Sequence, residues 1–488
     1  MSKSKSPPAA SALLILAAGL GKRMKSPLPK VLHEVCGEPM LVALLRSVAG
    51  AKADAEVGII VGHGREKVEA AVREAITKHP ALEKLRVEFL LQSEQRGTGH
   101  AVREAMATAW GKARIAAKTS VAVLPGDSPL IPIALVEAML APLAKGEAVR
   151  LLTCELPDPR GYGRIVRKAG KVLRIVEEKD ASPKERQVRE VGASIYAFES
   201  GFLAASLPKL TTKNAQGEYY LTDLIAAAAK AKKKIGTLAW ANPEDVRGVN
   251  DLWELSLAER ALQLRIVERL ARNGVRFTDP GSVAVEAGVR IGEGVKIHRG
   301  VVLRGATEIG DGADIGSNTV LRSCRVGSGV IFKAGCYAEN SVVESEATVG
   351  PYAHLRPESR VGKGAKIGNF VELKKAVIGE KTSIAHLSYV GDAFIGARVN
   401  IGCGFITCNF DGRVKNGVRK HVTVIEDDCF IGSDVQMVAP VKIGKGAYVA
   451  SGSTITKNVE SGALAIARTR QENKAGYAAR LRQMSEKE

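Results

Sequence analysis

Short apolar runs alternate with longer stretches of helical periodicity over the first half of the chain. The apolar runs fall at residues 12–19, 55–63, 85–92 and 120–127, each long enough for one buried strand. Between them, residues 40–51 and 64–78 carry apolar side chains at the spacing of an amphipathic helix. Strands that alternate with helices predict an α/β domain with a mainly parallel, doubly wound sheet.

A second pattern begins after Phe277. Aliphatic residues recur at every sixth position, as in the series Val349, Leu355, Val361, Ile367 and Leu373, and the spacing returns at 309–321, 425–437 and 443–455. A period of six fits neither a helix nor an ordinary strand. It is typical of hexapeptide repeats, which form a parallel β-helix with stacked aliphatic side chains in its interior. The 50 glycines and the aromatic content of 5% agree with this repeat.

The two patterns divide the chain of 488 residues. Residues 1–11 are predicted to form a disordered tail, residues 12–250 the α/β domain, residues 251–273 a linker helix, and residues 274–488 the β-helix domain with a polar, basic and partly mobile end. The start of the chain imitates a signal peptide, but its apolar run leads directly into the glycine-rich string GLGKRMKSPLPK, so we interpret it as a tail and a first strand. No apolar run approaches the roughly 18 residues of a spanning helix.

Charge and cysteine content narrow the function classes. A net charge of +19 suits nucleic acid, an anionic membrane surface, phosphorylated substrates, or simply a solvated basic surface. The sequence shows no basic and aromatic platform for stacking bases, which disfavours nucleic acid. The seven cysteines lack the paired spacing of a zinc site or a disulfide framework, so we expect reduced thiols in the cytoplasm.

The string LILAAGLGKRMKSPLPK follows the first predicted strand. Its Gly19 and Gly21 allow backbone N–H groups to approach phosphates closely. Met24 excludes the dinucleotide fingerprint, and Arg23 after Lys22 excludes a P-loop. The whole string, with Arg23 and Lys30, resembles the signature of sugar-nucleotide pyrophosphorylases.

Further along this half, LLQSEQRGTGHA resembles the base-binding segment of uridylyltransferases, and Asp127 follows a strand at the edge where such sheets bind ligands. Taken alone, Asp127 suits a helix N-cap as well as a Mg²⁺ ligand. The resemblance implies that Mg²⁺ is bound by Asp127 and Asn250. It implies that UTP and the product UDP-sugar are bound by Leu16, Ala17, Ala18, Gly19, Lys30, Gln92, Gly97, Thr98, Gly163, Glu177, Gly192 and Asn250.

In this reaction the sugar 1-phosphate attacks the α-phosphorus of UTP in line and pyrophosphate leaves, while Arg23 and Lys30 offset the charge on the phosphates. Two positions depart from the family pattern. Gly192 stands where the family usually has an Asn that contacts the sugar, and Pro125 stands where it often has Tyr.

Within the six-residue repeat, the small residue that usually follows the aliphatic is replaced by Arg356 and by Lys374. Two cations at equivalent positions suggest a site for a sugar phosphate, or solvated charges on a basic surface. His386 in SIAHLSYVGD could take a proton from an amine that attacks a thioester, with Glu372 orienting the ring.

The segment from RPES to CNFDG resembles the acetyltransferase domain of the bifunctional N-acetylglucosamine-1-phosphate uridylyltransferase/glucosamine-1-phosphate acetyltransferase family. With the first half, the resemblance covers roughly residues 12–475. It implies a left-handed β-helix, a cytoplasmic homotrimer with acetyltransferase sites between subunits, and a role in peptidoglycan and lipopolysaccharide synthesis. It also implies that glucosamine 1-phosphate is bound by Arg356, Lys374, Tyr389 and Asn400, and acetyl-CoA by Cys403, Asn409, Phe410, Ser433, Ser451 and Arg468.

Three features near the expected acetyl donor depart from the family. Cys403 replaces an Ala and is interpreted as a small packed thiol rather than a nucleophile. Phe410 replaces a Tyr, and residues 413–421 lengthen a loop.

Three alternatives stay open on the sequence alone. The chain could be a single-function nucleotidyltransferase with a structural or regulatory β-helix, a non-catalytic regulatory subunit, or a basic nucleic-acid-binding protein. His386 with its neighbours argues against the first, and the expected metal ligands Asp127 and Asn250 against the second. A steep salt dependence of DNA or RNA retention would favour the third.

Overall fold

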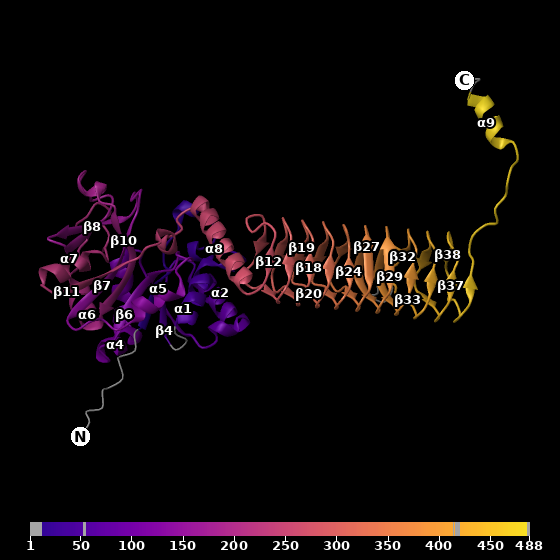
Figure 1. Ribbon diagram of the computed structural model, residues 1–488. Helices are drawn as coiled ribbons and strands as arrows, with labels where there is room; N and C mark the ends of the chain where they lie inside the picture. The colour runs from indigo at the N-terminus through magenta and orange to yellow at the C-terminus, as the bar shows by residue number, and fades with distance from the viewer. Residues whose placement is uncertain (1–11, 52–54, 413, 415–419, 486–488) are drawn as a thin grey trace. The chain divides into compact units, whose positions relative to one another are not determined.

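The structure is a computed structural model that describes residues 12–51, 55–412, 414 and 420–485. It divides into two compact units, residues 1–262 and 263–488, and each is described by itself (Figure 1). The division falls within helix α8 (Leu252–Arg272), which is found where the sequence predicts a helix. The expected disordered tail at 1–11 lies outside the described residues.

The first unit is built on a nine-stranded sheet. Seven of its strands follow the order β11–β7–β10–β6–β1–β4–β5, and the other two form a hairpin that pairs with β10. The four predicted strands are all present and mutually parallel, as β1 (Ala12–Leu16), β4 (Glu56–Val61), β5 (Arg86–Leu91) and β6 (Ser120–Pro125). The predicted helices are α1 (Met40–Ala51) and α2 (Arg65–Lys78). Periodicity therefore located this part of the domain correctly.

The remaining strands make the sheet more mixed than the sequence pattern predicts. Strand β10 (Glu190–Glu199) runs antiparallel to both β6 and β7 (Glu147–Glu155), while β11 (Lys234–Ala239) is parallel to β7. Strands β8 (Gly163–Lys168) and β9 (Lys171–Val176) form a hairpin across Ala169 and Gly170, whose φ angles are 48° and 75°. Two residues in the left-handed region suit such a tight hairpin turn.

Helices cover both faces of this sheet. Leu13 and Ile15 of β1 pack with α1, α2 and α5 (Ile133–Leu140), whereas Leu14 packs on the opposite face. That second face is covered by α3 (Thr98–Ala107), α4 (Ala109–Ala116), α6 (Ser200–Ser206) and α7 (Asp223–Lys230). The unit is thus a Rossmann-like layered fold with a core on each side.

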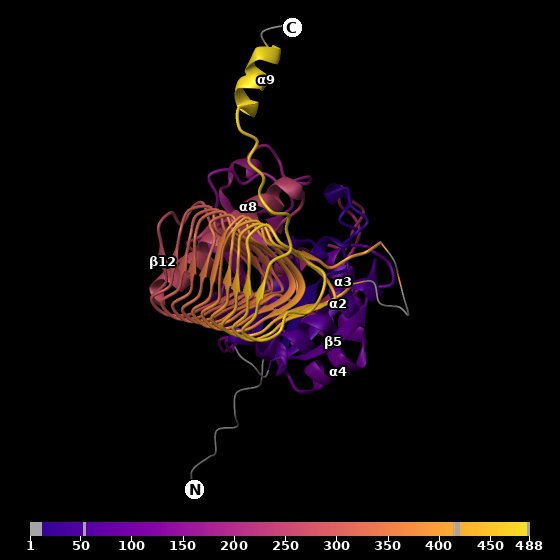
Figure 2. The ribbon, with the colours of Figure 1, turned by 90° about the vertical axis from the view of Figure 1, so that its right-hand side faces the viewer.

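The second unit is a parallel β-helix, whose stacked coils are seen nearly end-on in Figure 2. Its strands form parallel ladders of 11 and 17 members in which equivalent residues of successive coils pair. The series Val349, Leu355, Val361, Ile367 and Leu373 is fully buried, as the six-residue period predicts. The fold class expected from the sequence is confirmed.

Six strands of this unit carry the residues of interest. One ladder includes β25 (His354–Leu355), β28 (Glu372–Ile378) and β30 (Tyr389–Ile395). The other includes β27 (Lys366–Asn369), β29 (Ser383–His386) and β31 (Asn400–Ile401). Side chains at one position of a ladder therefore stack along the β-helix axis.

Three chain-wide features complete the fold. The basic end of the chain contains helix α9 (Tyr477–Ser485), all of whose residues are exposed. Across the described residues, no helix combines the length and apolarity needed to cross a membrane. All seven cysteines are free thiols, and burial raises the pKa of the Cys154 thiol to about 11.

Candidate active sites

A cavity of about 1040 Å³ in the first unit gathers most of the residues that the sequence singled out for uridylyl transfer. It opens at the carboxyl ends of β1 and β6, the edge at which sheets of this kind bind ligands. Ala17 is buried and does not line it. The predicted residues that do line it are Leu16, Ala18, Gly19, Arg23, Lys30, Gln92, Gly97, Thr98, Asp127, Gly163, Glu177, Gly192 and Asn250.

The glycine-rich loop brings Lys30 into this cavity. Gly21 has a φ of 60°, and a Cβ placed on it would lie 2.8 Å from the Cβ of Lys30. A side chain at this position would therefore collide with the lysine as well as strain the backbone. The glycine is needed here because the loop and Lys30 approach so closely.

The two predicted metal ligands share one hydrogen-bond partner in the cavity. Lys30 Nζ donates to Asp127 Oδ2 and, at 3.0 Å, to Asn250 Oδ1. Arg23 Nη2 donates to the same amide oxygen at 2.8 Å, and the backbone N–H of Asn250 donates to Glu254 Oε2 at 2.7 Å. The position of Asn250 is therefore fixed by Glu254 at its backbone N–H and by Arg23 and Lys30 at its side-chain oxygen.

A carboxylate and an amide oxygen are donors that suit Mg²⁺, so the residues present fit the implied metal. Over the described parts of the chain, no group of three or more His, Cys, Asp or Glu side chains could hold a metal ion. A cation at Asp127 and Asn250 would therefore complete its shell with water and substrate phosphate oxygens.

The predicted base-binding residues also line the cavity. Gln92 is buried, and its Nε2 lies 3.3 Å from the carbonyl oxygen of Gly97 and 3.2 Å from Nδ1 of His100. Gly97, with a φ of 104°, precedes helix α3, and Thr98 Oγ1 accepts from the backbone N–H of Leu221 at 3.2 Å. These hydrogen bonds fix the orientation of the side-chain and backbone polar groups that could recognise a base.

Glu177, which is expected to bind the sugar, lines the same cavity. Its Oε1 accepts a hydrogen bond of 2.9 Å from the hydroxyl of Thr222, which also lines the cavity. Burial raises the pKa of Glu177, and the nearby carboxylates of Asp180, Asp223 and Glu218 raise it further. Sequence reasoning missed Thr222, because only the fold brings it beside Glu177.

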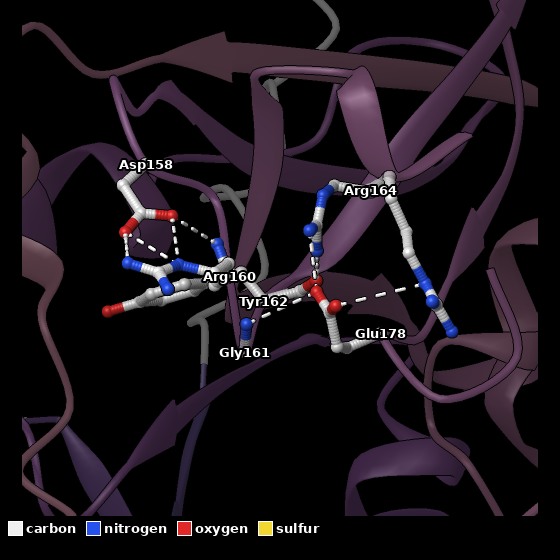
Figure 3. Close-up of polar contacts among 7 residues, drawn as sticks. Asp158, Arg160, Gly161, Tyr162, Arg164 and Glu178 are labelled. Carbon is white, nitrogen blue, oxygen red and sulfur yellow. Dashed lines mark hydrogen bonds and ion pairs between the residues drawn. The ribbon is translucent and has the colours of Figure 1, made fainter. Parts of the chain in front are cut away.

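The loop before Gly163 is tied down by charged contacts (Figure 3). Arg160 Nε donates to Asp158 Oδ2 at 2.8 Å, and hydrogen bonds from Arg160 lower the pKa of Asp158 to about 2. The buried Arg164 donates to the carbonyl of Tyr162 and, at 2.5 Å, to Glu178, which also accepts from the N–H of Gly161. No motif in the sequence marks these contacts, although Asp158, Arg160 and Tyr162 line the cavity.

Both departures from the family pattern also line the cavity, as Pro125 and Gly192. A Cβ placed on Gly192 would lie 3.1 Å from Ile175 Cδ1, which is tighter than ordinary contact. The wall formed by Ile175 thus leaves little room for a larger side chain at residue 192.

In the β-helix, Arg356 and Lys374 occupy equivalent positions in successive coils, as predicted. The register pairs Leu355 with Leu373, and each cation directly follows one of these buried leucines. Arg356 Nη1 donates to Glu372 Oε1 at 2.9 Å. The Lys374 side chain makes no hydrogen bond or ion pair with any of the described residues, which leaves its ammonium available to an anion.

His386 lies on the neighbouring ladder and differs from expectation in its partner. Its Nδ1 is 2.7 Å from Oδ1 of Asn369, one coil earlier. Among the described residues, the Glu372 carboxylate pairs with Arg356 and makes no hydrogen bond or ion pair with the ring. The orienting role expected of Glu372 stays a prediction, and Asn369 is a partner of His386 that sequence reasoning missed.

The other predicted substrate residues are arranged around these coils. Asn409 Nδ2 donates to Asp392 Oδ2 at 2.6 Å and lies 3.5 Å from the hydroxyl of Tyr389. Asn400 pairs in register with Ser383 of β29. Phe410 lies under the ammonium of Lys420 at 4.4 Å, while most of the 413–421 extension lies outside the described residues.

The residues expected at acetyl-CoA form a column. Cys403, Ser433 and Ser451 each stand two residues after a ladder-paired aliphatic, so they occupy one position in three successive coils. Ser433 N–H donates to Ser451 Oγ at 3.2 Å, and Arg468 lies near Gly452, next to the end of this column. Three small side chains in a row leave a shallow surface against which an extended ligand could lie.

Comparisons with known proteins match a different family in each of the two units. Residues 13–170 match the MobA-like NTP transferase domain family, and residues 288–323 and 423–457 match the bacterial transferase hexapeptide family of six repeats. The bifunctional protein GlmU of Alkaliphilus metalliredigens is 43% identical over 469 residues, covering 96% of this chain and 98% of the relative.

Two further relatives carry the same name. GlmU of Pelobacter propionicus is 44% identical and covers 96% of this chain and 98% of the relative. GlmU of Sorangium cellulosum is 45% identical and covers 96% of each. Similarity of this extent spans both units and both sets of site residues, and the chain belongs to the GlmU family of bifunctional proteins.

Proposed function

We propose that this chain makes UDP-N-acetylglucosamine in two steps, acetyl transfer to glucosamine 1-phosphate in the β-helix and uridylyl transfer in the Rossmann-like unit. Family membership makes it a bifunctional enzyme with nucleotidyltransferase and acetyltransferase activities. The observation that carries the assignment of residues is the convergence of Lys30, Asp127 and Asn250 in the cavity of the first unit, in a chain whose second unit holds His386.

In the uridylyl step, the residues that line the cavity would position the reactants. Gln92, Gly97 and Thr98 would bind uracil and ribose, and Glu177 would accept from sugar hydroxyls. Arg23 and Lys30 would leave Asn250 and Asp127 to neutralise the phosphates as pyrophosphate departs. Mg²⁺ on Asp127 and Asn250 would polarise the phosphates.

In the acetyl step, Lys374 and Arg356 would bind the phosphate of glucosamine 1-phosphate, with Tyr389 and Asn400 on the sugar. Nε2 of His386 would accept the proton that the amine loses as its nitrogen attacks the thioester carbonyl carbon. The C–S bond then breaks and coenzyme A leaves as the thiol. Asn409, Phe410 and the column of Cys403, Ser433 and Ser451, with Arg468, would hold acetyl-CoA.

The proposal includes a homotrimer in the cytoplasm. Tyr352, Phe370 and Leu387 form an apolar stack on the β-helix surface and are 57%, 57% and 56% exposed, and Tyr352 and Phe370 stack at 5.7 Å. A row of exposed apolar side chains favours burial against another subunit. Free thiols at all seven cysteines suit a reducing compartment. Sedimentation of the purified protein tests the trimer.

Two assays separate the two sites. Thiol release is followed with glucosamine 1-phosphate and acetyl-CoA, and pyrophosphate release with N-acetylglucosamine 1-phosphate, UTP and Mg²⁺. We expect His386→Ala to lose thiol release by about a hundredfold or more and to keep pyrophosphate release. Asp127→Ala should show the reverse pattern.

Each variant is thus the control for the other. Pyrophosphate release without thiol release in the wild type would leave a single-function nucleotidyltransferase with a passive β-helix. Family membership disfavours that alternative, and the Asn369–His386 contact gives the β-helix a base with a defined partner.

A further inference from the structure

The imidazole of His386 is held by the coil that precedes it. Oδ1 of Asn369 lies 2.7 Å from Nδ1 of the ring. An amide oxygen only accepts hydrogen bonds, so Nδ1 carries the proton and Nε2 keeps its lone pair. This is the tautomer that a base acting through Nε2 requires.

The β-helix register produces this contact. Asn369 stands two residues after Ile367, His386 stands two after Ile384, and both pairs are aligned between β27 and β29. Equivalent residues of neighbouring parallel strands lie about 4.8 Å apart, so two side chains from one position meet. The backbone N–H of Leu387 also donates to the carbonyl of Asn369 at 3.0 Å.

Glu372 belongs to a different row of side chains. Its register partners are His354 and Tyr389, on the ladder of β25, β28 and β30. Its carboxylate accepts from Arg356 at 2.9 Å, and both side chains are partly exposed. Glu372 is therefore placed to orient the guanidinium that would bind the substrate phosphate.

We propose that Asn369 is the positioning residue of His386, so that a neutral amide, rather than a carboxylate, fixes the tautomer of the base. The inference rests on the proposed role of His386 in acetyl transfer. An amide orients the ring without adding a negative charge that would favour the imidazolium.

The charged groups near the ring have other partners or lie on other rows. Asp392 accepts from Asn409 at 2.6 Å, Lys375 pairs with Glu358 at 3.1 Å, and Glu372 pairs with Arg356. The titratable groups on the strands packed around β29 are Lys366 of β27, Glu372, Lys374 and Lys375 of β28, and Tyr389 and Asp392 of β30.

The pH dependence of thiol release tests the inference in the full-length protein. Asn369→Asp places a carboxylate on Nδ1 and favours the imidazolium, so we expect the acid limb of the kcat/KM profile to move up by about one pH unit. Asn369→Ala frees the ring and should lower kcat about tenfold, with the KM for acetyl-CoA nearly unchanged. Glu372→Gln should leave the acid limb in place and raise the KM for glucosamine 1-phosphate.

The opposite pattern overturns the inference: an unmoved acid limb in Asn369→Asp together with a shifted one in Glu372→Gln would return the orienting role to Glu372. Failure of the underlying function looks different, because His386→Ala would then release thiol as fast as the wild type. Pyrophosphate release and the thermal midpoint of the same preparations report folding, and Asn369→Asp changes the side-chain volume little.

Discussion

Lys30 lies between the two oxygens proposed for Mg²⁺. Its ammonium donates to Asp127 and, at 3.0 Å, to Asn250, and the lysine and aspartate side chains are only 13% and 23% exposed. A cation held by both ligands competes with any metal that uses the same oxygens. Metal binding at this site therefore requires the ammonium to leave, and the phosphates of the nucleotide would offer it a new partner.

Replacing Lys30 should accordingly strengthen metal binding in the absence of nucleotide. We expect Lys30→Met to lower the Kd for Mn²⁺, used as a probe of the magnesium site, about fivefold, which corresponds to roughly 1 kcal/mol. Electron paramagnetic resonance of free Mn²⁺ during titration measures this Kd. Lys30→Arg keeps the cation and serves as the matched control. Equal Kd values for the wild type and Lys30→Met would mean that Lys30 does not compete.

At the scale of elements, residues 218–222 connect the base-binding segment to the carboxylate expected to bind the sugar. The carbonyl of Tyr219 accepts from the N–H of Gly99 at 2.8 Å, and the N–H of Leu221 donates to Thr98 at 3.2 Å. One residue further on, Thr222 donates to Glu177 at 2.9 Å. One short segment thus fixes the start of helix α3 with its backbone and the sugar-site carboxylate with a side chain.

Thr222→Val should weaken sugar binding more than nucleotide binding. Loss of a hydrogen bond to a charged group predicts an increase of about tenfold in the KM for N-acetylglucosamine 1-phosphate. The Thr222 hydroxyl lowers the pKa of Glu177, which burial raises. Without the hydroxyl the pKa of Glu177 rises further. As the pH falls, the carboxylate is then protonated at a higher pH than in the wild type, and the KM for the sugar phosphate begins to rise at that higher pH.

Pyrophosphate release measured across pH checks both effects, and Thr222→Ser, which keeps the hydroxyl, should restore the wild-type profile. An unchanged sugar KM in Thr222→Val would show that Glu177 needs no support from this segment.

These elements also show what the sequence could and could not predict. The six-residue period located the buried aliphatics, and alternating periodicity located β1, β4, β5 and β6, because burial of one face imposes both patterns. Asn369 could have been found from the sequence, because it stands two residues after Ile367, just as His386 stands two residues after Ile384. No such signal marks Thr222, whose partner Glu177 lies 45 residues earlier and is reached only through the folded sheet.

At the scale of the whole molecule, both proposed sites take phosphorylated substrates, and the chain has a net charge of +19. Long-range attraction of anions suits both proposed reactions, since glucosamine 1-phosphate and acetyl-CoA in one half, and N-acetylglucosamine 1-phosphate and UTP in the other, would all carry phosphate groups. The charge therefore needs no nucleic-acid partner to explain it.

The division into two compact units predicts that damage stays local. At Gly368, a Cβ would lie 1.7 Å from the carbonyl oxygen of Ala385, beside the Asn369–His386 contact. Gly368→Ala must push these coils apart, at a cost of about 1–3 kcal/mol. We expect it to abolish acetyl transfer and leave uridylyl transfer from N-acetylglucosamine 1-phosphate intact.

Gly111→Ala is the reciprocal variant in the first unit, because its Cβ would lie 2.3 Å from the Cα of Met106, away from the cavity. Residual activity after brief heating, assayed separately for thiol and pyrophosphate, should fall at a lower temperature only for pyrophosphate in Gly111→Ala. In Gly368→Ala, pyrophosphate release should survive heating as well as in the wild type. If either substitution lowered both activities in parallel, the two units would have to unfold together. Both sites would then be lost at the same temperature, and the prediction would be wrong.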